Sequence, residues 1–155
     1  MLIRPAAPSD ASLVTRLRLE FLAAEGGVDV SSFDDAFVAQ TGRFVARGLA
    51  DGTLPSWIAE DDGGLAVGIV SMVVHDMQPR PGDARTLEGY VINMYVAPLA
   101  RRSGIGGALF DACLAWARTN GVRRVTLVAT DDGRSMYERR GFVPNPAFLE
   151  VPIAD

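Results

Sequence analysis

The sequence passes from a strand to a helix through a run rich in glycine and arginine, Tyr95-Val96-Ala97-Pro98-Leu99-Ala100-Arg101-Arg102-Ser103-Gly104-Ile105-Gly106-Gly107-Ala108-Leu109. The apolar residues before Pro98 predict a strand, and the glycines open a helix over residues 105–119. Because glycine has no side chain, an anion can approach backbone N–H groups at a helix N-terminus. Arg101 and Arg102 add cations suited to phosphate oxygens. The run indicates a pyrophosphate-binding turn or, more simply, a glycine-rich helix start with surface arginines.

Two common phosphate-binding motifs are excluded by single residues. A dinucleotide fingerprint beginning at Gly104 requires a sixth residue of glycine, and that position is Leu109. A P-loop requires lysine, and the sequence contains none, since all its basic residues are arginine.

The residues around this turn predict an alternation of strands and helices. Apolar periodicity and turn residues predict strands at 2–4, 57–60, 66–74, 90–96, 124–130 and 148–153, with helices at 10–25, 33–48, 105–119 and 135–140. Ser9 or Asp10 would cap the first helix, and Ser31 or Ser32 the second. The segment 61–64 predicts a hairpin turn, and residues 76–86 a long loop.

Hairpin-linked strands followed by a βαβ unit predict a mixed, mostly antiparallel sheet. The helices are expected on both faces of this sheet. The fold class is therefore α/β (α+β), with residues 1–155 forming a single domain.

Composition narrows the possible functions. The chain has 155 residues, is 48% apolar and carries a net charge of −4, which disfavours nucleic acid as a partner. Cys113 and His75 are the single cysteine and histidine, too few for a disulfide or a Cys/His zinc site, so no metal is expected. Residues 1–5 lack the apolar core of a signal peptide, and no run approaches the ~20 residues that span a bilayer. We therefore expect a cytoplasmic protein with no membrane partner.

Three segments together resemble the GNAT superfamily of N-acetyltransferases. Arg101-x-x-Gly104-x-Gly106 matches its Q/R-x-x-G-x-G/A signature, and Asn93-Met94-Tyr95-Val96-x-Pro98 resembles the strand before it. Tyr137-Glu138-Arg139-Arg140-Gly141-Phe142 resembles its Y-E-x-x-G-F segment. The order of predicted elements also fits the family over essentially the whole chain.

The resemblance implies that acetyl-CoA is the acyl donor. Backbone amides of the turn would hold the pyrophosphate, and the edge of the preceding strand would bind pantetheine. The cofactor-binding residues it implies are Met94, Tyr95, Val96, Arg101, Arg102, Ser103, Gly104, Ile105, Gly106, Gly107, Ser135 and Tyr137. Ser135 could equally cap a short helix. The family often has asparagine where this chain has Thr130-Asp131-Asp132, so no CoA contact is assigned there.

The resemblance also implies catalytic roles for Met94 and Tyr137. The Met94 N–H would polarise the thioester carbonyl, and Tyr137 would protonate the departing sulfur. Glu88, at the start of the strand that leads to Met94, is the candidate base. The alternatives are a packing role for Tyr137 and a solvated surface carboxylate at Glu88. His75 is a second candidate base, and Cys113 is expected in the core.

The function that follows is an acetyl-CoA-dependent N-acetyltransferase, which moves the acetyl group directly to a primary amine of a small molecule or peptide. The alternative is a non-catalytic acyl-CoA-binding or sensing domain on the same fold. The acceptor pocket is expected between the first two helices, the 76–86 loop and nearby strand ends. A homodimer is compatible with the resemblance, with the C-terminal strand at its interface.

Overall fold

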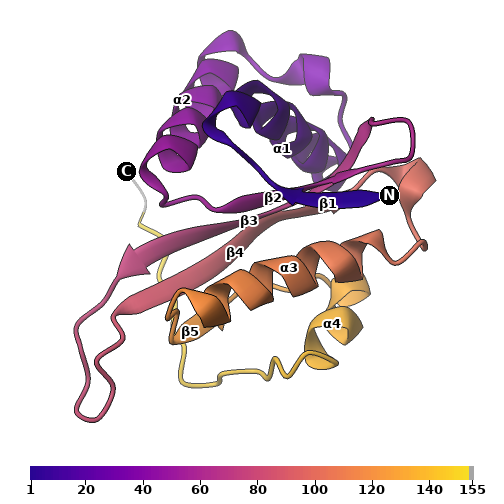
Figure 1. Ribbon diagram of the computed structural model, residues 1–155. Helices are drawn as coiled ribbons and strands as arrows, with labels where there is room; N and C mark the ends of the chain where they lie inside the picture. The colour runs from indigo at the N-terminus through magenta and orange to yellow at the C-terminus, as the bar shows by residue number, and fades with distance from the viewer. Residues whose placement is uncertain (154–155) are drawn as a thin grey trace.

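The computed structural model describes residues 1–153 and is organised around one twisted sheet (Figure 1). Within these residues the strands are β1 (Leu2–Pro5), β2 (Ser56–Glu60), β3 (Ala66–Asp76), β4 (Leu87–Val96) and β5 (Arg124–Thr126). They lie in the order β1-β2-β3-β4-β5. All neighbours are antiparallel except β4 and β5, which are parallel. The predicted mixed, mostly antiparallel sheet is confirmed.

Helices cover both faces of this sheet. In Figure 1, α1 (Ala11–Gly26) and α2 (Asp35–Asp51) lie above it, while α3 (Ile105–Thr119) and α4 (Asp131–Glu138) lie below. Short 3-10 turns occupy Pro8–Asp10, Val30–Ser32 and Pro98–Ala100. Leu17 and Ile69 lie in the core under α1, and Met72 and Leu109 in the core above α3. Because β3 and β4 are covered on both sides, their sequences are nearly continuously apolar.

The best-predicted boundaries are those set by glycine or by a hairpin turn. Helix α1 ends at Gly27, which takes the left-handed conformation at φ 63°. Helix α3 has the predicted bounds. The β2–β3 hairpin also forms as predicted, because Asp61 Oδ1 accepts hydrogen bonds from the backbone N–H groups of Gly63 and Leu65, both at 2.9 Å.

Asp10 occupies the predicted N-cap position of α1 but makes no side-chain capping bond, and the predicted N-caps of the second helix are wrong. Asp10 does not cap α1 with its side chain; it accepts hydrogen bonds from Arg4 and from the Ala7 N–H. Helix α2 starts later than predicted because Asp34 is its cap, accepting a 2.8 Å bond from the Phe37 N–H. Ser31 and Ser32 lie instead in the preceding 3-10 turn.

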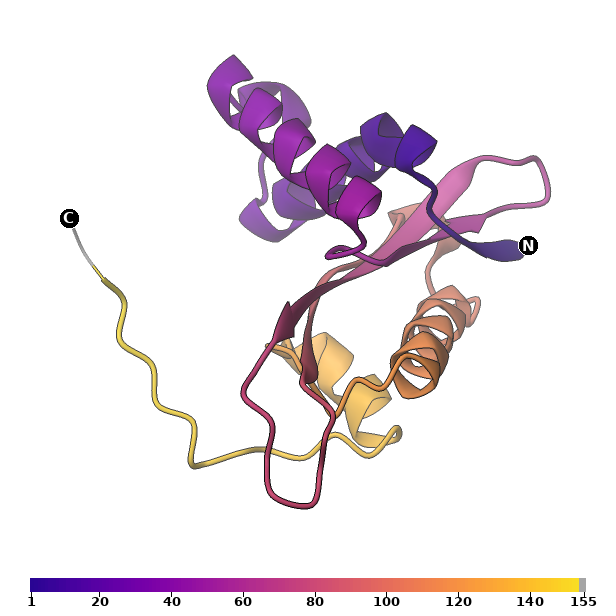
Figure 2. The same cartoon turned by 60° about the vertical axis from the view of Figure 1, so that its left-hand side comes forward.

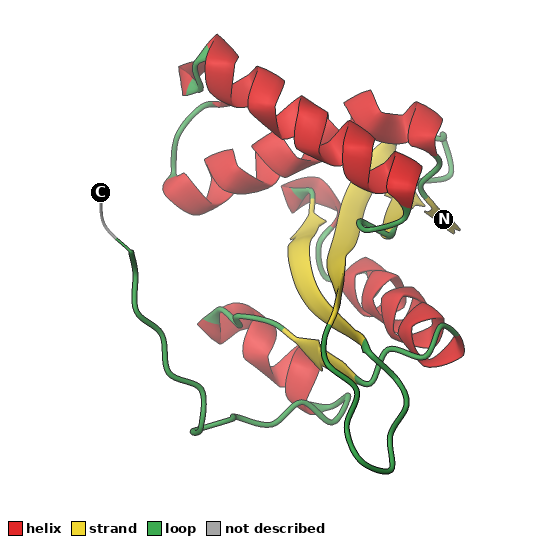
Figure 3. Ribbon diagram, turned by 90° about the vertical axis from the view of Figure 1, so that its left-hand side faces the viewer, coloured by secondary structure: helices red, strands yellow, loops and turns green. Residues whose placement is uncertain are grey.

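The end of the chain differs most from the prediction. Strand β5 stops at Thr126, and Thr130 caps α4, which starts at Asp131 rather than near Ser135. Residues 148–153 form no strand; Figures 2 and 3 show them as an extended segment that leaves the body. Three prolines (Pro144, Pro146 and Pro152) interrupt the region, and proline has no N–H to donate to a sheet. The dimer contact was expected to form through a C-terminal strand, and residues 148–153 do not form that strand.

None of the helices in the described residues is both long and apolar enough to cross a membrane.

Candidate active site

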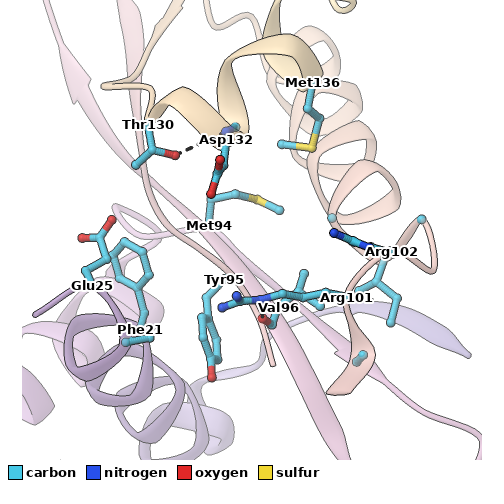
Figure 4. Close-up of a pocket in the computed structure, with 16 residues that line it drawn as sticks. Phe21, Glu25, Met94, Tyr95, Val96, Arg101, Arg102, Thr130, Asp132 and Met136 are labelled. Carbon is cyan, nitrogen blue, oxygen red and sulfur yellow. Dashed lines mark hydrogen bonds between the residues drawn. The ribbon is translucent and has the colours of Figure 1, made fainter. Parts of the chain in front are cut away.

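A pocket of about 780 Å³ opens where β4 and β5 separate (Figure 4). The two strands pair only at Glu88–Tyr90 and Arg124–Thr126, whereas β4 continues to Val96. Beyond Tyr90 no strand of residues 1–153 pairs with that edge of β4, so backbone polar groups face the gap. The end of α1, the turn before α3 and the start of α4 close the other sides.

The glycine turn presents free backbone N–H groups to this pocket. Gly104 caps α3 in the left-handed conformation at φ 82°, and Arg102 has φ 62°. Ser103 Oγ donates a 2.6 Å hydrogen bond to the Ala100 carbonyl, which closes the turn. The first N–H groups of a helix have no intrahelical partner and carry the positive end of its dipole. The turn therefore offers the anion site that its glycines predict.

The two arginines of the turn increase its positive charge. Arg101 and Arg102 are exposed, and neither forms an ion pair with a carboxylate of the described residues. Arg101 Nε donates a 3.0 Å hydrogen bond to the Val96 carbonyl, which links the turn to the end of β4. The guanidinium groups thus stand beside the pocket with charge available for an anion.

Gly106 leaves room between two methionines on the pocket wall. A Cβ at this position would lie 3.3 Å from Met94 Cε and 3.7 Å from Met136 Sδ. A side chain on Gly106 would therefore push into the space where α3, α4 and β4 meet.

Strand β4 is not regular where it borders the pocket. Ile92 pairs with Ser71 and Tyr95 with Ile69, so Asn93 and Met94 together stand opposite Val70 alone. Asn93 has φ 58° and is 2% exposed, and its Oδ1 accepts a 2.8 Å hydrogen bond from Arg18 Nη1. This bulge turns the backbone just before Met94. The regular strand expected over residues 90–96 did not anticipate it.

Tyr137 lies directly behind the pocket wall. Its ring packs 5.0 Å from that of Phe110, centroid to centroid. A Cβ on Gly133, which lines the pocket, would stand 3.1 Å from Tyr137 Cε2. The hydroxyl makes no hydrogen bond within residues 1–153, and burial raises its pKa. Ser135, on the same helix, is exposed and does not line the pocket.

Glu88 lies at the opposite end of β4 from the pocket. Met94 lies six positions further along the strand, roughly 20 Å away at the usual rise per residue. Its carboxylate accepts hydrogen bonds from Arg124 Nη2 at 2.6 Å and Arg123 Nε at 2.9 Å. Burial alone would raise the pKa of Glu88, but these arginines lower it. His75 pairs with Glu88 across β3 and β4, so it is equally remote.

The structure thus brings together most of the expected cofactor-binding residues and separates the expected base from them. Lining the pocket are Met94, Tyr95, Val96, Arg101, Arg102, Gly104, Ile105 and Gly106. Ser103 and Gly107 belong to the same turn and first helical turn without lining the pocket.

Several lining residues were not predicted as site residues. From α1 come Phe21, Ala24 and Glu25, and from α4 and its cap come Thr130, Asp132, Gly133 and Met136. Figure 4 shows Phe21 and Glu25 on the side opposite Arg101 and Arg102. The spacing of Phe21, Ala24 and Glu25 over the last two turns of α1 was the available signal, since residues three and four apart share a helix face. The Glu25 carboxylate forms no ion pair with any described residue.

Among residues 1–153 no group of three histidine, cysteine or carboxylate side chains could hold a metal ion. Cys113 is fully buried in the core as predicted, and burial raises the pKa of its thiol to about 12.

Comparisons with known proteins agree with this geometry. Residues 20–142 match the sequence profile described as "Acetyltransferase (GNAT) family". A predicted acetyltransferase from Clostridium acetobutylicum, crystallised with acetyl-CoA, is 27% identical with a TM-score of 0.84, covering 97% of this chain and 95% of that one. A GCN5-related N-acetyltransferase from Ralstonia eutropha is 28% identical with a TM-score of 0.78, covering 99% of each chain.

A curated relative is similar over a shorter stretch. A mycothiol acetyltransferase from Beutenbergia cavernae is 36% identical over 91 residues, which are 57% of this chain and 28% of that protein. The matched segment therefore spans little more than a quarter of this relative's length.

Proposed function

Since the chain belongs to the GNAT family of acetyltransferases, we propose that it transfers an acetyl group from acetyl-CoA directly to a primary amine. The observation that carries the proposal is the position of the arginine-glycine turn beside the unpaired edge of β4. The turn suits a pyrophosphate, and the unpaired strand edge suits an extended chain with amide groups. CoA contains both.

The donor would lie along the pocket from the turn to the gap between the strands. N–H groups of residues 102–107 and the charges of Arg101 and Arg102 would hold the pyrophosphate. The backbone of Met94 and Val96 would pair with the pantetheine, as an added strand pairs with an open sheet edge. The Val96 carbonyl already accepts from Arg101, which ties the two subsites together.

The chemistry requires an oxyanion donor and an acid. The amine nitrogen attacks the thioester carbon, and the Met94 N–H stabilises the negative charge that develops on oxygen. As the C–N bond forms the C–S bond breaks, and the leaving thiolate takes the proton of the Tyr137 hydroxyl. Burial raises the pKa of Tyr137, so the hydroxyl stays protonated at neutral pH.

The acceptor would enter from the α1 side of the pocket. Phe21 offers an apolar face there, and the unpaired carboxylate of Glu25 favours a cationic amine over a neutral one. Because Glu88 is remote and held by arginines, we assign it no catalytic role. The ammonium must lose a proton before its nitrogen can attack; this proton would leave through water, and Glu25 is the carboxylate that α1 contributes to the pocket.

A screen of amines with thiol release as the signal tests this function. The library should contain amino acids, polyamines, aminoglycosides, peptide N-termini and lysine peptides, and calorimetry should measure acetyl-CoA binding in parallel. We expect tight acetyl-CoA binding and turnover with at least one cationic amine. Binding without turnover on any amine would contradict the enzymatic proposal.

A further inference from the structure

Arg18 is an arginine in an unusual environment. It lies on α1, one turn before Phe21, and its side chain is half-buried. Its Nη1 donates to Asn93 Oδ1 at 2.8 Å, and its Cζ lies 5.7 Å from the centre of the Phe21 ring. Within residues 1–153 it forms no ion pair with a carboxylate. Burial lowers the pKa of Arg18, and the through-space charge of Glu25 offsets this only in part, so packing alone does not account for arginine here.

Asn93, whose side chain accepts this hydrogen bond, has an uncommon backbone conformation. Asn93 is a buried non-glycine residue at φ 58°, within the β4 bulge. Asparagine tolerates the left-handed region better than most residues, but this conformation is uncommon inside a strand and persists where the surroundings fix it. The bond from Arg18 is the side-chain interaction that holds the Asn93 amide in this conformation.

The conformation of Asn93 determines the direction of the next N–H. The peptide plane that joins Asn93 to Met94 contains the Met94 N–H, and rotation about the Asn93 backbone turns this plane. If Asn93 returned to an extended conformation, the bulge would be lost and the Met94 N–H would point elsewhere.

We propose that Arg18 is a positioning residue for acetyl transfer, which acts through Asn93 to aim the Met94 N–H into the pocket. The inference rests on the proposed function, in which that N–H stabilises the oxyanion. Arg18 itself does not line the pocket; in this proposal it fixes a donor that must be oriented before the reaction. A catalytic group misplaced by about 1 Å can cost 10²-fold in rate.

The test is a double-mutant cycle between Arg18→Met and Asn93→Gly. Methionine keeps an unbranched stem without the guanidinium, and glycine adopts the left-handed conformation without support. We expect Arg18→Met alone to lower kcat by about 10–100-fold with little change in the KM of the amine. In the Asn93→Gly background, which should itself lose only a few-fold, Arg18→Met should have almost no further effect. Arg18→Lys should recover part of the rate.

Two controls separate the proposal from structural and substrate-binding roles. Arg16→Met on the same helix removes an arginine that pairs with Glu20 on the protein surface, and it should leave kcat unchanged. A full loss from Arg18→Met in the Asn93→Gly background, or a loss confined to KM, would show that Arg18 acts on the substrate directly and would overturn the proposal. An Arg18→Met protein with an unchanged kcat and only a lower melting temperature would also overturn the proposal.

An NMR measurement keeps this inference distinct from the proposed function. The Met94 amide of the wild type should shift more on adding acetyl-CoA than on adding CoA, and this difference should disappear in Arg18→Met. An equal difference in both proteins would refute the role of Arg18 while leaving the acetyltransferase proposal intact. A wild-type protein that binds no acetyl-CoA would refute both.

Discussion

Glu88 and Arg124 lie opposite each other in the parallel pair of β4 and β5, and a 2.6 Å hydrogen bond joins Glu88 Oε2 to Arg124 Nη2. Arg123, with a side chain only 4% exposed, donates to the other carboxylate oxygen at 2.9 Å. The carboxylate therefore fastens β5 to β4 at the end where the two strands still pair. The same contacts make it a poor base.

Replacing this carboxylate should affect stability and not catalysis. We expect Glu88→Gln to lower the free energy of unfolding at pH 7 by about 3 kcal/mol, since it leaves the buried Arg123 guanidinium without a counter-charge. In the plot of kcat against pH, the limb that reports ionisation of the catalytic base should be the same in Glu88→Gln as in the wild type. Urea unfolding and kcat against pH check both expectations; a lost basic limb in a folded variant would restore Glu88 as the base.

The same variant should change the acid sensitivity of the fold. The folded-state pKa of Glu88 is lowered, so its contribution to stability is present above the unfolded pKa of about 4.3 and is lost as the pH falls through the folded value. Wild-type stability should therefore decline on acidification below about pH 4, and Glu88→Gln should decline less steeply over this interval. Parallel urea titrations between pH 3 and pH 7 measure the difference.

Gly104 allows the charge of the glycine turn to be tested without changing its shape. Its φ of 82° suits glycine, and nothing lies within 4 Å of a Cβ built there. Asparagine and aspartate have similar size and both tolerate this conformation. We expect Gly104→Asp to weaken acetyl-CoA binding by about 10–100-fold through repulsion of the pyrophosphate, and Gly104→Asn to weaken it much less. Calorimetry that finds equal affinities for the two variants would place the pyrophosphate elsewhere.

Two glycines of α2 should respond oppositely to alanine. A Cβ at Gly48 would stand 2.5 Å from Leu54 Cβ, whereas at Gly42 the nearest atoms belong to Thr15, at 4.0 Å. We expect Gly48→Ala to destabilise by about 1–3 kcal/mol through overpacking. Gly42→Ala should stabilise by about 0.5–1 kcal/mol through helix propensity. Thermal melts of both variants test the packing of α2; destabilisation of similar size in both would contradict it.

Much of the fold could be predicted because local chemistry decides it. Gly104 opens α3 with a conformation that glycine adopts readily, and Asp61 with Gly64 closes a hairpin between two apolar runs. The pyrophosphate turn was also predictable, because all its residues are consecutive and its conformation is therefore set locally. The resemblance to a known family added the position of Met94 relative to that turn.

The remaining features depend on contacts that the sequence does not display. The left-handed conformation of Asn93 is hidden in a run of strand-forming residues and depends on Arg18, 75 positions away. Glu88 was expected near the acceptor, but it lies at the far end of β4, where Arg123 and Arg124 bind its carboxylate. The predicted strand at 148–153 followed a mostly apolar run and gave too little weight to Pro152 within it.

The acid can be identified by comparing the two buried tyrosines near the pocket. Tyr95 lines the pocket and packs 6.3 Å from the ring of Phe21, while Tyr137 lies behind Gly133. Burial raises the pKa of both. We expect Tyr137→Phe to lower the single-turnover rate by about 10²–10⁴-fold, the usual range for a positioned acid. Tyr95→Phe should stay within a few-fold of wild type.

Stability and pH dependence distinguish this role from packing. The Tyr137 hydroxyl makes no hydrogen bond to residues 1–153, so its removal should leave the melting temperature and acetyl-CoA affinity nearly unchanged. Because its pKa is raised, the wild-type rate should fall only above about pH 10, where the tyrosine loses its proton. Tyr137→Phe should lack this fall. A folded Tyr137→Phe protein with the wild-type single-turnover rate would exclude Tyr137 as the acid, and a large loss in Tyr95→Phe alone would transfer the role to Tyr95.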